Sequence, residues 1–251
     1  MKVKISIVSY SNTLPFLYGL KNSELINDID LSLDIPSKCA EKLLTNQVDI
    51  GLVPVAILPL LPEYHILTDF CIGANKKVNS VILVSDVPLN EIETILLDYQ
   101  SKTSINLVQV LAREYWKILP QFKHATVGFE DKIEGKTAAV IIGDRTFNMP
   151  KSYNYRYDLA EEWYKFTGLP FAFACWVANK PIPQEFEEKL NQALSFGVNH
   201  KQESIGLSNN NGITFDQLQN YLTNDISYEL TDEKRKSIQL FLDYLTQNVN
   251  I

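Results

Sequence analysis

The sequence predicts an α/β protein of two lobes with a ligand cleft between them. Strand and helix patterns alternate along the first half of the chain, which favours βαβ units and a mostly parallel sheet. The order of strand, polar turn and helix starts again near Pro88. No repeat or low-complexity linker separates these units, so we expect the chain to cross between them in extended segments.

In the first unit, short apolar runs predict strands at residues 3–8, 29–35, 48–53, 65–72 and 78–84. A helix is expected over residues 13–20, where Pro15 suits the first turn. A second helix is expected from Ser37, because the apolar residues that follow it recur at helical spacing.

In the second unit, strands are expected at residues 94–97, 125–127 and 137–142, and a helix follows the polar turn at 98–104. Asp158 is placed to cap another helix, which Gly168 ends. From Pro181 onward the pattern is mainly helical, and Thr231 begins the last helix.

Two long strand-like runs, at residues 78–87 and 171–179, are the expected crossovers. The first domain would then be discontinuous, made of residues 1–85 and 177–251, with residues 86–176 inserted as the second domain. The oligomeric state is left open.

Composition excludes several classes of protein. The chain has 251 residues and a net charge of -7, with acids and bases interspersed, whereas a nucleic-acid surface needs a basic stripe. No apolar run is long enough to cross a membrane, and no secretory signal pattern is present, so we expect a cytoplasmic protein that binds neither nucleic acid nor membrane. Three scattered cysteines in apolar runs predict buried, reduced thiols.

The usual catalytic motifs are missing. There is no G-x-S-x-G elbow, phosphate-binding glycine loop, H-E-x-x-H or paired C-x-x-C, and the three histidines lack metal-ligand spacing. We therefore expect no metal and no nicotinamide or other cofactor.

The most informative segment is the polar turn at residues 9–17, SYSNTLPFL, between the first strand and the first helix. In open α/β sheets, ligands bind at the carboxyl ends of strands, near helix N-termini that favour anions. Asn12 is therefore a candidate site residue. It is equally suited to capping the helix, and the turn alone does not decide between these roles.

Three further segments follow in order: VDIGLVPV at residues 48–55, IGA with VNSVILVS between residues 72 and 85, and a run from 157 to 176 that includes YDLAEEW and TGLPFAFACW. Together with the turn, these segments resemble the chorismate dehydratase family of the futalosine route to menaquinone, from the first strand to about Asn179. The resemblance implies a type II periplasmic-binding-protein-like fold with the ligand in the cleft between the lobes.

The resemblance also implies a reaction in which chorismate loses water to give 3-[(1-carboxyvinyl)oxy]benzoate. It assigns the catalytic role to Asn12 and Ser80, with the substrate's own side-chain carboxylate as a possible proton acceptor. Without the resemblance, Asn12 would be interpreted as a helix cap and Ser80 as a surface hydroxyl.

The substrate-binding residues expected with them come from the polar turn, from the ends of two other strands and from the start of the second-domain helix: Ser9, Tyr10, Pro54, Ser101, Thr103, Ser104, Gly143 and Asp144. For Thr103 and Ser104, simple capping is the alternative. Two positions depart from the common family pattern, Ser11 and Arg145, and they leave open which cation meets which carboxylate.

Two other functions suit the same fold. A binding or effector-binding protein for small carboxylates would use an identical cleft without chemistry. The sister enzyme, 1,4-dihydroxy-6-naphthoate synthase, shares the two-lobed architecture, but the Ser-Tyr-x-Asn turn favours the dehydratase.

Overall fold

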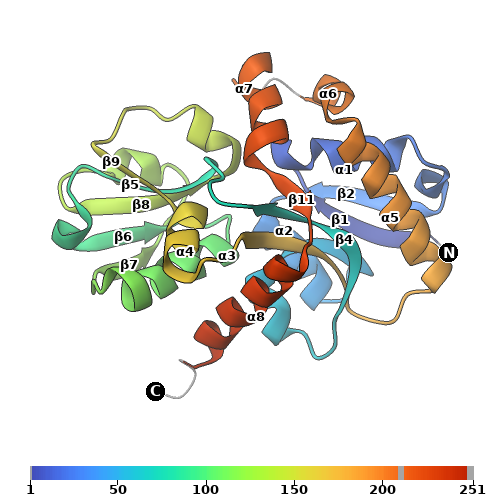
Figure 1. The fold of residues 1–251 in the computed structure, drawn as a ribbon, viewed down its shortest axis with the longest axis horizontal. Coiled ribbons are helices and arrows are strands. Elements are labelled where there is room, and N and C mark those ends of the chain that lie inside the picture. The colour runs from blue at the N-terminus through green and yellow to red at the C-terminus, as the bar shows by residue number, and fades with distance from the viewer. Residues whose placement is uncertain (1, 209–211, 248–251) are drawn as a thin grey trace.

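The computed structural model describes residues 2–208 and 212–247, and two lobes are visible, each built on one β-sheet (Figure 1). The first lobe contains a six-stranded sheet, whose strands in spatial order are β11 (Ser227–Glu229), β4 (His65–Ala74), β10 (Phe171–Ala178), β3 (Ile50–Pro54), β1 (Val3–Val8) and β2 (Ile29–Asp34). The second lobe contains a five-stranded sheet in the order β7 (Gln121–His124), β6 (Thr94–Leu97), β8 (Thr137–Ile142), β5 (Val81–Ser85) and β9 (Tyr155–Asp158).

The expectation of a mostly parallel sheet was wrong, because both sheets are mixed. β1 runs parallel to β2 and β3, but β10 lies antiparallel between β3 and β4. In the second sheet, β6 is parallel to β7 and β8, whereas β5 is antiparallel to β8 and β9. The chain leaves the first lobe after β4 and returns through β10, so these neighbouring strands run in opposite directions.

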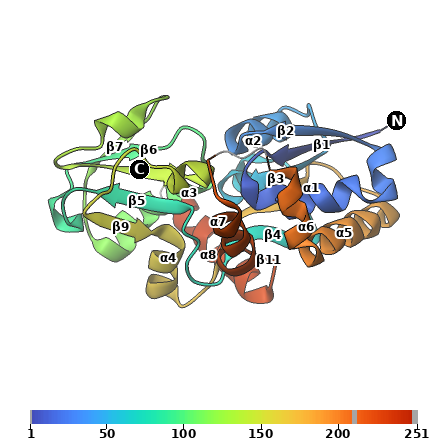
Figure 2. The same ribbon diagram turned by 90° about the horizontal axis from the view of Figure 1, so that it is seen from above.

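The helices cover the two sheets and also join the lobes (Figure 2). They are α1 (Leu14–Lys21), α2 (Pro36–Leu44), α3 (Thr103–Val110), α4 (Leu159–Thr167), α5 (Gln184–Asn199), α6 (Lys201–Ser204), α7 (Phe215–Asn220) and α8 (Asp232–Thr246). Asp158 caps α4 and Gly168, at φ 75°, ends it, as the sequence predicts. The side chain of Thr231 accepts from the N–H of Lys234 and so caps α8.

The backbones of α1 and α5 touch at two glycines. A Cβ on Gly19 would lie 2.0 Å from the carbonyl oxygen of Ala193, and a Cβ on Gly197 would lie 1.9 Å from that of Pro15. No side chain fits between the helices at these points. This contact fixes α1, and hence the turn that precedes it.

One predicted strand was wrong, and three observed strands were not predicted. The strand expected at residues 125–127 is absent, because β7 ends at His124 and the next residues leave the sheet. β7, β9 and β11 were not predicted, because all three are short edge strands of mixed polarity that carry little periodic signal.

The two crossings differ from the expected domain limits. β5, expected in the first domain, pairs with β8 and β9 in the second sheet. β10, expected largely in the second domain, pairs with β3 and β4 in the first sheet. Both runs are apolar because both strands lie inside a sheet, so hydrophobicity does not reveal which sheet each one joins. We propose domain limits at residues 75–80 and 168–170, where the chain passes between the sheets.

The C-terminal helix α8 packs across the junction of the lobes. Trp163 of α4 is fully buried and meets the rings of Phe171, Phe241 and Tyr244 edge-on, at centroid distances of 5.3–6.3 Å. Its indole N–H donates to Ser237 Oγ at 2.9 Å. The aromatic cluster therefore ties the second lobe to the helix that closes the chain.

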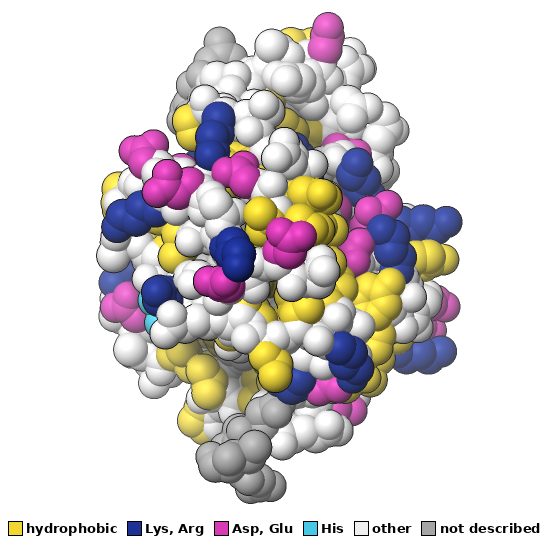
Figure 3. Space-filling view, turned by 90° about the vertical axis from the view of Figure 1, so that its left-hand side faces the viewer, with side chains coloured by type: hydrophobic (Ala, Val, Ile, Leu, Met, Phe, Trp, Pro, Cys, Tyr) yellow, Lys and Arg dark blue, Asp and Glu magenta, His cyan; other side chains and the backbone are white. Residues whose placement is uncertain are grey.

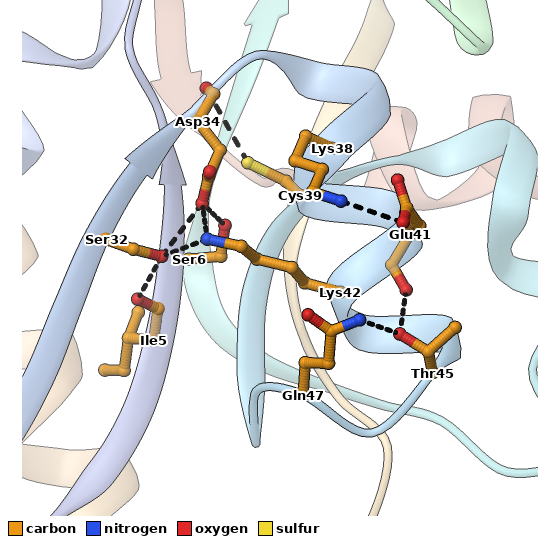
Figure 4. Close-up of polar contacts among 10 residues, drawn as sticks. All are labelled: Ile5, Ser6, Ser32, Asp34, Lys38, Cys39, Glu41, Lys42, Thr45 and Gln47. Atoms are coloured by element: carbon orange, nitrogen blue, oxygen red, sulfur yellow. Dashed lines mark hydrogen bonds and ion pairs between the residues drawn. The ribbon is translucent and has the colours of Figure 1, made fainter.

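A partly buried polar cluster joins α2 to β1 and β2 (Figure 4). The hydroxyls of Ser6 and Ser32 each donate to Asp34 Oδ2 at 2.8 Å, and Lys42 Nζ lies 2.5 Å from the same oxygen. Burial opposes ionisation of Asp34, but the hydrogen bonds from Lys42, Ser6 and Ser32 outweigh it and lower the pKa of the carboxyl. Through this cluster, Pro36 at the start of α2 is held beside the cleft.

The outer face of the second lobe carries lysines, arginines and acidic residues side by side, with apolar side chains between them (Figure 3). Within the described residues, no helix is both long and apolar enough to span a membrane.

Candidate functional site

A small cavity lies between the two lobes. Its volume is about 60 Å³. The residues that line it are Val8, Tyr10, Asn12, Pro36, Pro54, Ile72, Val78, Ser80, Val81, Ser101, Thr103, Ser104, Ile142, Gly143, Phe173 and Ala174. Eight of the ten residues expected in a site therefore meet around one space.

The turn after β1 places Tyr10 and Asn12 at this cavity. Residues Ser11–Thr13 form a 3₁₀ turn, so α1 begins only at Leu14. Thr13 Oγ1 donates to the carbonyls of Val8 and Tyr10, at 2.6 and 2.8 Å, and locks the turn. Asn12 lies inside the 3₁₀ turn and does not cap α1, so the capping interpretation was wrong.

The side chain of Asn12 is 9% exposed, and its Oδ1 is a buried atom without a hydrogen-bond partner among the described residues. Its backbone carbonyl is held by the hydroxyl of Tyr228, at 3.0 Å. An unpaired buried acceptor costs about 1–3 kcal/mol. Asn12 therefore has unused hydrogen-bonding capacity where a ligand group would lie.

Ser80 is positioned by the crossing segment before β5. The N–H groups of Val78 and Asn79 donate to Asp158 Oδ2 at 3.0 and 2.6 Å, and Asn79 takes a left-handed φ of 63°. Burial raises the pKa of Asp158, and four backbone N–H donors oppose that rise. The carbonyl of Ser80 accepts from the N–H of Gly143 at 2.9 Å. One carboxylate thus caps α4 and shapes the turn that carries Ser80.

The start of α3 brings Ser101, Thr103 and Ser104 to the cavity. Ser101 Oγ accepts from the N–H of Ser104 at 2.9 Å. Thr103 Oγ1 donates to the carbonyl of Phe173 at 2.9 Å and accepts from the N–H of Ala56 at 3.3 Å. Both partners of Thr103 belong to the first lobe, so its hydroxyl already links the lobes, whereas Ser101 and Ser104 remain the better candidates for contact with a ligand.

Gly143 allows the lobes to meet closely. Its φ is 66°, and a Cβ there would lie 2.8–2.9 Å from three carbons of the Tyr10 ring. The hydroxyl of Tyr10 is hydrogen-bonded to Gln100 of the second lobe. Tyr10 is therefore packed and anchored across the cleft.

Ser9 and Asp144 do not line the cavity. They lie in an adjoining groove of about 360 Å³, beside Tyr10 and Arg145. Asp144 accepts from the N–H of Ser11 at 3.1 and 3.2 Å and from its hydroxyl at 2.9 Å, so it joins the second lobe to the first. Ser11 therefore contributes a contact between the lobes.

Arg145 lines the adjoining groove, and its charge is paired. Its guanidinium contacts the carboxylate of Asp98 and lies 2.9 Å from Glu130. It also faces the rings of Tyr99 and Phe129. Among the described residues that line the cavity, none has a charged side chain.

Tyr10 is the one ionisable group in that described lining. Burial, with a smaller contribution from the charge of Asp98, raises the pKa of its phenol, so Tyr10 is neutral at physiological pH. The site thus offers hydroxyls, an amide and apolar walls, with no side chain suited to accept a proton near neutral pH.

Sequence reasoning missed Tyr221, whose hydroxyl donates to Ser80 Oγ at 2.6 Å. It also missed Phe173 and the apolar wall. Tyr221 lies in a C-terminal helical region that carries no motif, and only the fold brings it next to a residue 141 positions earlier.

Comparisons with known proteins agree with the fold. A chorismate dehydratase from Thermus thermophilus is 24% identical over 262 residues, covering 96% of this chain and 94% of that protein. A crystal structure from Archaeoglobus fulgidus superposes with a TM-score of 0.78 at 12% identity, covering 100% of this chain and 98% of the other. A Candida albicans protein described as having the generic periplasmic-binding-protein fold superposes with a TM-score of 0.65 at 10% identity, covering 100% and 95%.

These likenesses confirm the predicted periplasmic-binding-protein-like fold. The menaquinone biosynthesis family matches residues 3–247, almost the whole chain. This protein therefore belongs to the menaquinone biosynthesis family.

Proposed function

We propose that this protein is a chorismate dehydratase, which eliminates water from chorismate to give 3-[(1-carboxyvinyl)oxy]benzoate. The observation that carries the proposal is the chemistry of the cavity: an amide and hydroxyls converge on a space without a general base among its described lining residues. Membership of the menaquinone biosynthesis family and the likeness to a chorismate dehydratase support the same reaction.

The proposed reaction needs little from the protein. The C3–H bond of the ring breaks, its electrons form a ring double bond, and the C4–O bond breaks. Overall, the proton removed from C3 and the hydroxide lost from C4 amount to one water molecule. Because the product ring is aromatic, the step is downhill, and the protein contributes mainly orientation and stabilisation of developing charge.

The substrate's own side-chain carboxylate is the proposed proton acceptor. Tyr10 is neutral, and the other described side chains at the cavity do not titrate near neutral pH. We propose that the cavity holds the substrate in a folded conformation, with its side-chain carboxylate over C3. Ser80 and Asn12 then act on the departing hydroxyl, and Ser101 and Ser104 with the start of α3 receive a carboxylate.

The cavity is smaller than the substrate. A cavity of about 150 Å³ accommodates benzene, whereas this one has about 60 Å³ and would have to receive a substituted ring. We therefore propose that the lobes separate to admit chorismate and close over it at contacts such as Ser11 with Asp144. We propose that the hinges lie at residues 75–80 and 168–170, where the chain passes between the two sheets.

The test is to incubate the purified protein with chorismate and to follow the mass of the product. Loss of one water, with the ultraviolet absorption of a substituted benzoate, is the expected result. Binding of chorismate without loss of water would instead favour the effector-binding function. Turnover of a later pathway intermediate, with chorismate untouched, would favour the sister enzyme, 1,4-dihydroxy-6-naphthoate synthase.

A further inference from the structure

A fully buried tyrosine from the C-terminal part of the first lobe reaches the candidate site. Tyr221 begins the single turn Tyr221–Asp225 that continues α7. Its hydroxyl donates to Ser80 Oγ at 2.6 Å. Its ring meets that of Phe147 of the second lobe edge-on, with centroids 5.0 Å apart. These contacts fix both the ring and the hydroxyl.

The number of available protons determines which group donates in each of these hydrogen bonds. A tyrosine hydroxyl has one proton, and Tyr221 gives it to Ser80. The side chain of Asn12 lowers the pKa of the Tyr221 phenol, which is the effect of a donor, so its amide N–H is the part that faces the Tyr221 oxygen. The amide oxygen then faces away from Tyr221. This matches the observation that Asn12 Oδ1 is buried without a partner among the described residues.

The hydroxyl of Ser80 also has a single proton. Its Oγ accepts from Tyr221, so its own proton is available to the cavity that Ser80 lines. The site therefore presents an acceptor, Asn12 Oδ1, and a donor, Ser80 Oγ–H, each one hydrogen bond from Tyr221. A hydroxyl group both donates and accepts, and it is the group that complements this pair.

We infer that Tyr221 is a positioning residue that orients the Asn12 amide and the Ser80 hydroxyl to hold a ligand hydroxyl between them. The inference rests on the proposed function, in which that hydroxyl is the one chorismate loses. As the C4–O bond breaks, negative charge grows on the oxygen and the hydrogen bond from Ser80 strengthens. Tyr221 supports this donation, because hydrogen bonds in a chain polarise one another.

The decisive variant is Tyr221→Phe, which keeps the ring against Phe147 and removes only the hydroxyl. We expect kcat to fall about tenfold, the effect of one hydrogen bond on the barrier. KM should stay within about threefold of wild type. Tyr221→Phe should cost less in the Ser80→Ala background than in wild type, because only the contact with Asn12 is then left to lose. Ser237→Ala is the matched control, because it deletes a buried hydrogen bond of 2.9 Å to Trp163 outside the cavity. It should lower Tm and leave kcat unchanged.

Wild-type kcat in Tyr221→Phe, or a full additive loss in the Ser80→Ala background, would overturn the inference. An equal loss of kcat in Ser237→Ala would also overturn it, because the effect would then reflect general stability. In each of these cases the wild-type protein still dehydrates chorismate and the proposed function stands. Failure of the wild-type protein to release water from chorismate removes the proposed function itself, and the inference with it.

Discussion

Gly143→Ala tests whether the activity depends on close approach of the two lobes. The added methyl group would lie 2.8–2.9 Å from carbons of the Tyr10 ring. The ring has little freedom to move, because the hydroxyl of Tyr10 is hydrogen-bonded to Gln100. Gly143 and Tyr10 belong to different lobes, so the overlap exists only when the cleft is closed.

The expected magnitude has two parts. The left-handed φ of 66° costs an alanine about 1–2 kcal/mol whether the lobes are open or closed. Overpacking against the ring costs about 1–3 kcal/mol in the closed state alone. A closing penalty of that size lowers the apparent affinity by roughly 5- to 150-fold. We therefore expect KM to rise strongly while Tm falls by only a few degrees.

Gly128→Ala is the matched control. Gly128 has a similar φ of 77°, but a Cβ there would meet no atom within 4 Å. It lies outside both proposed hinges, so this variant should show a similar loss of Tm with wild-type KM. The assay is steady-state kinetics on chorismate, with small-angle scattering with and without a substrate analogue to follow closure. If Gly143→Ala and Gly128→Ala have the same KM, contact between Gly143 and Tyr10 is not needed for closure.

The remaining predictions concern the polar groups. Ser80→Ala should lower kcat by about 10²–10³ with Tm close to wild type, because it removes one preorganised donor; steady-state kinetics that give an unchanged kcat would contradict the assignment. Asn12→Asp adds a negative charge to a cavity with no charged side chain in its described lining, so kcat/KM should fall at least tenfold, and wild-type values would refute a direct role. The pKa of Asp34 is lowered in the folded state, so its contribution to stability is full above the ordinary carboxyl pKa of about 4 and is lost as the pH falls through the folded-state pKa. Urea unfolding from pH 7 to pH 2.5 should therefore be steeper in pH for wild type than for Asp34→Asn, and equal slopes would show that Asp34 makes no such contribution.

The sequence by itself determined the local structure wherever one physical signal dominated. β1, β6 and β8 fall at the predicted residues, because each is a short apolar run bounded by polar turns. α4 lies between its caps Asp158 and Gly168, as predicted, because the capping chemistry of these residues is local. The polar turn at residues 9–12 also indicated the candidate site, because polar residues at a strand's carboxyl end can be recognised without the fold, and Tyr10 and Asn12 line the cavity.

Only the tertiary structure decided which sheet β5 and β10 join, since both are apolar and strand pairing depends on residues far away in the chain. It also separated residues that look alike in sequence: Ser101 and Ser104 face the cavity, whereas the hydroxyl of Thr103 is used between the lobes and Asp144 binds Ser11 outside the cavity. Tyr221 reaches Ser80 across 141 positions. Such a hydrogen bond depends on packing between distant segments, and periodicity and capping describe only neighbours along the chain.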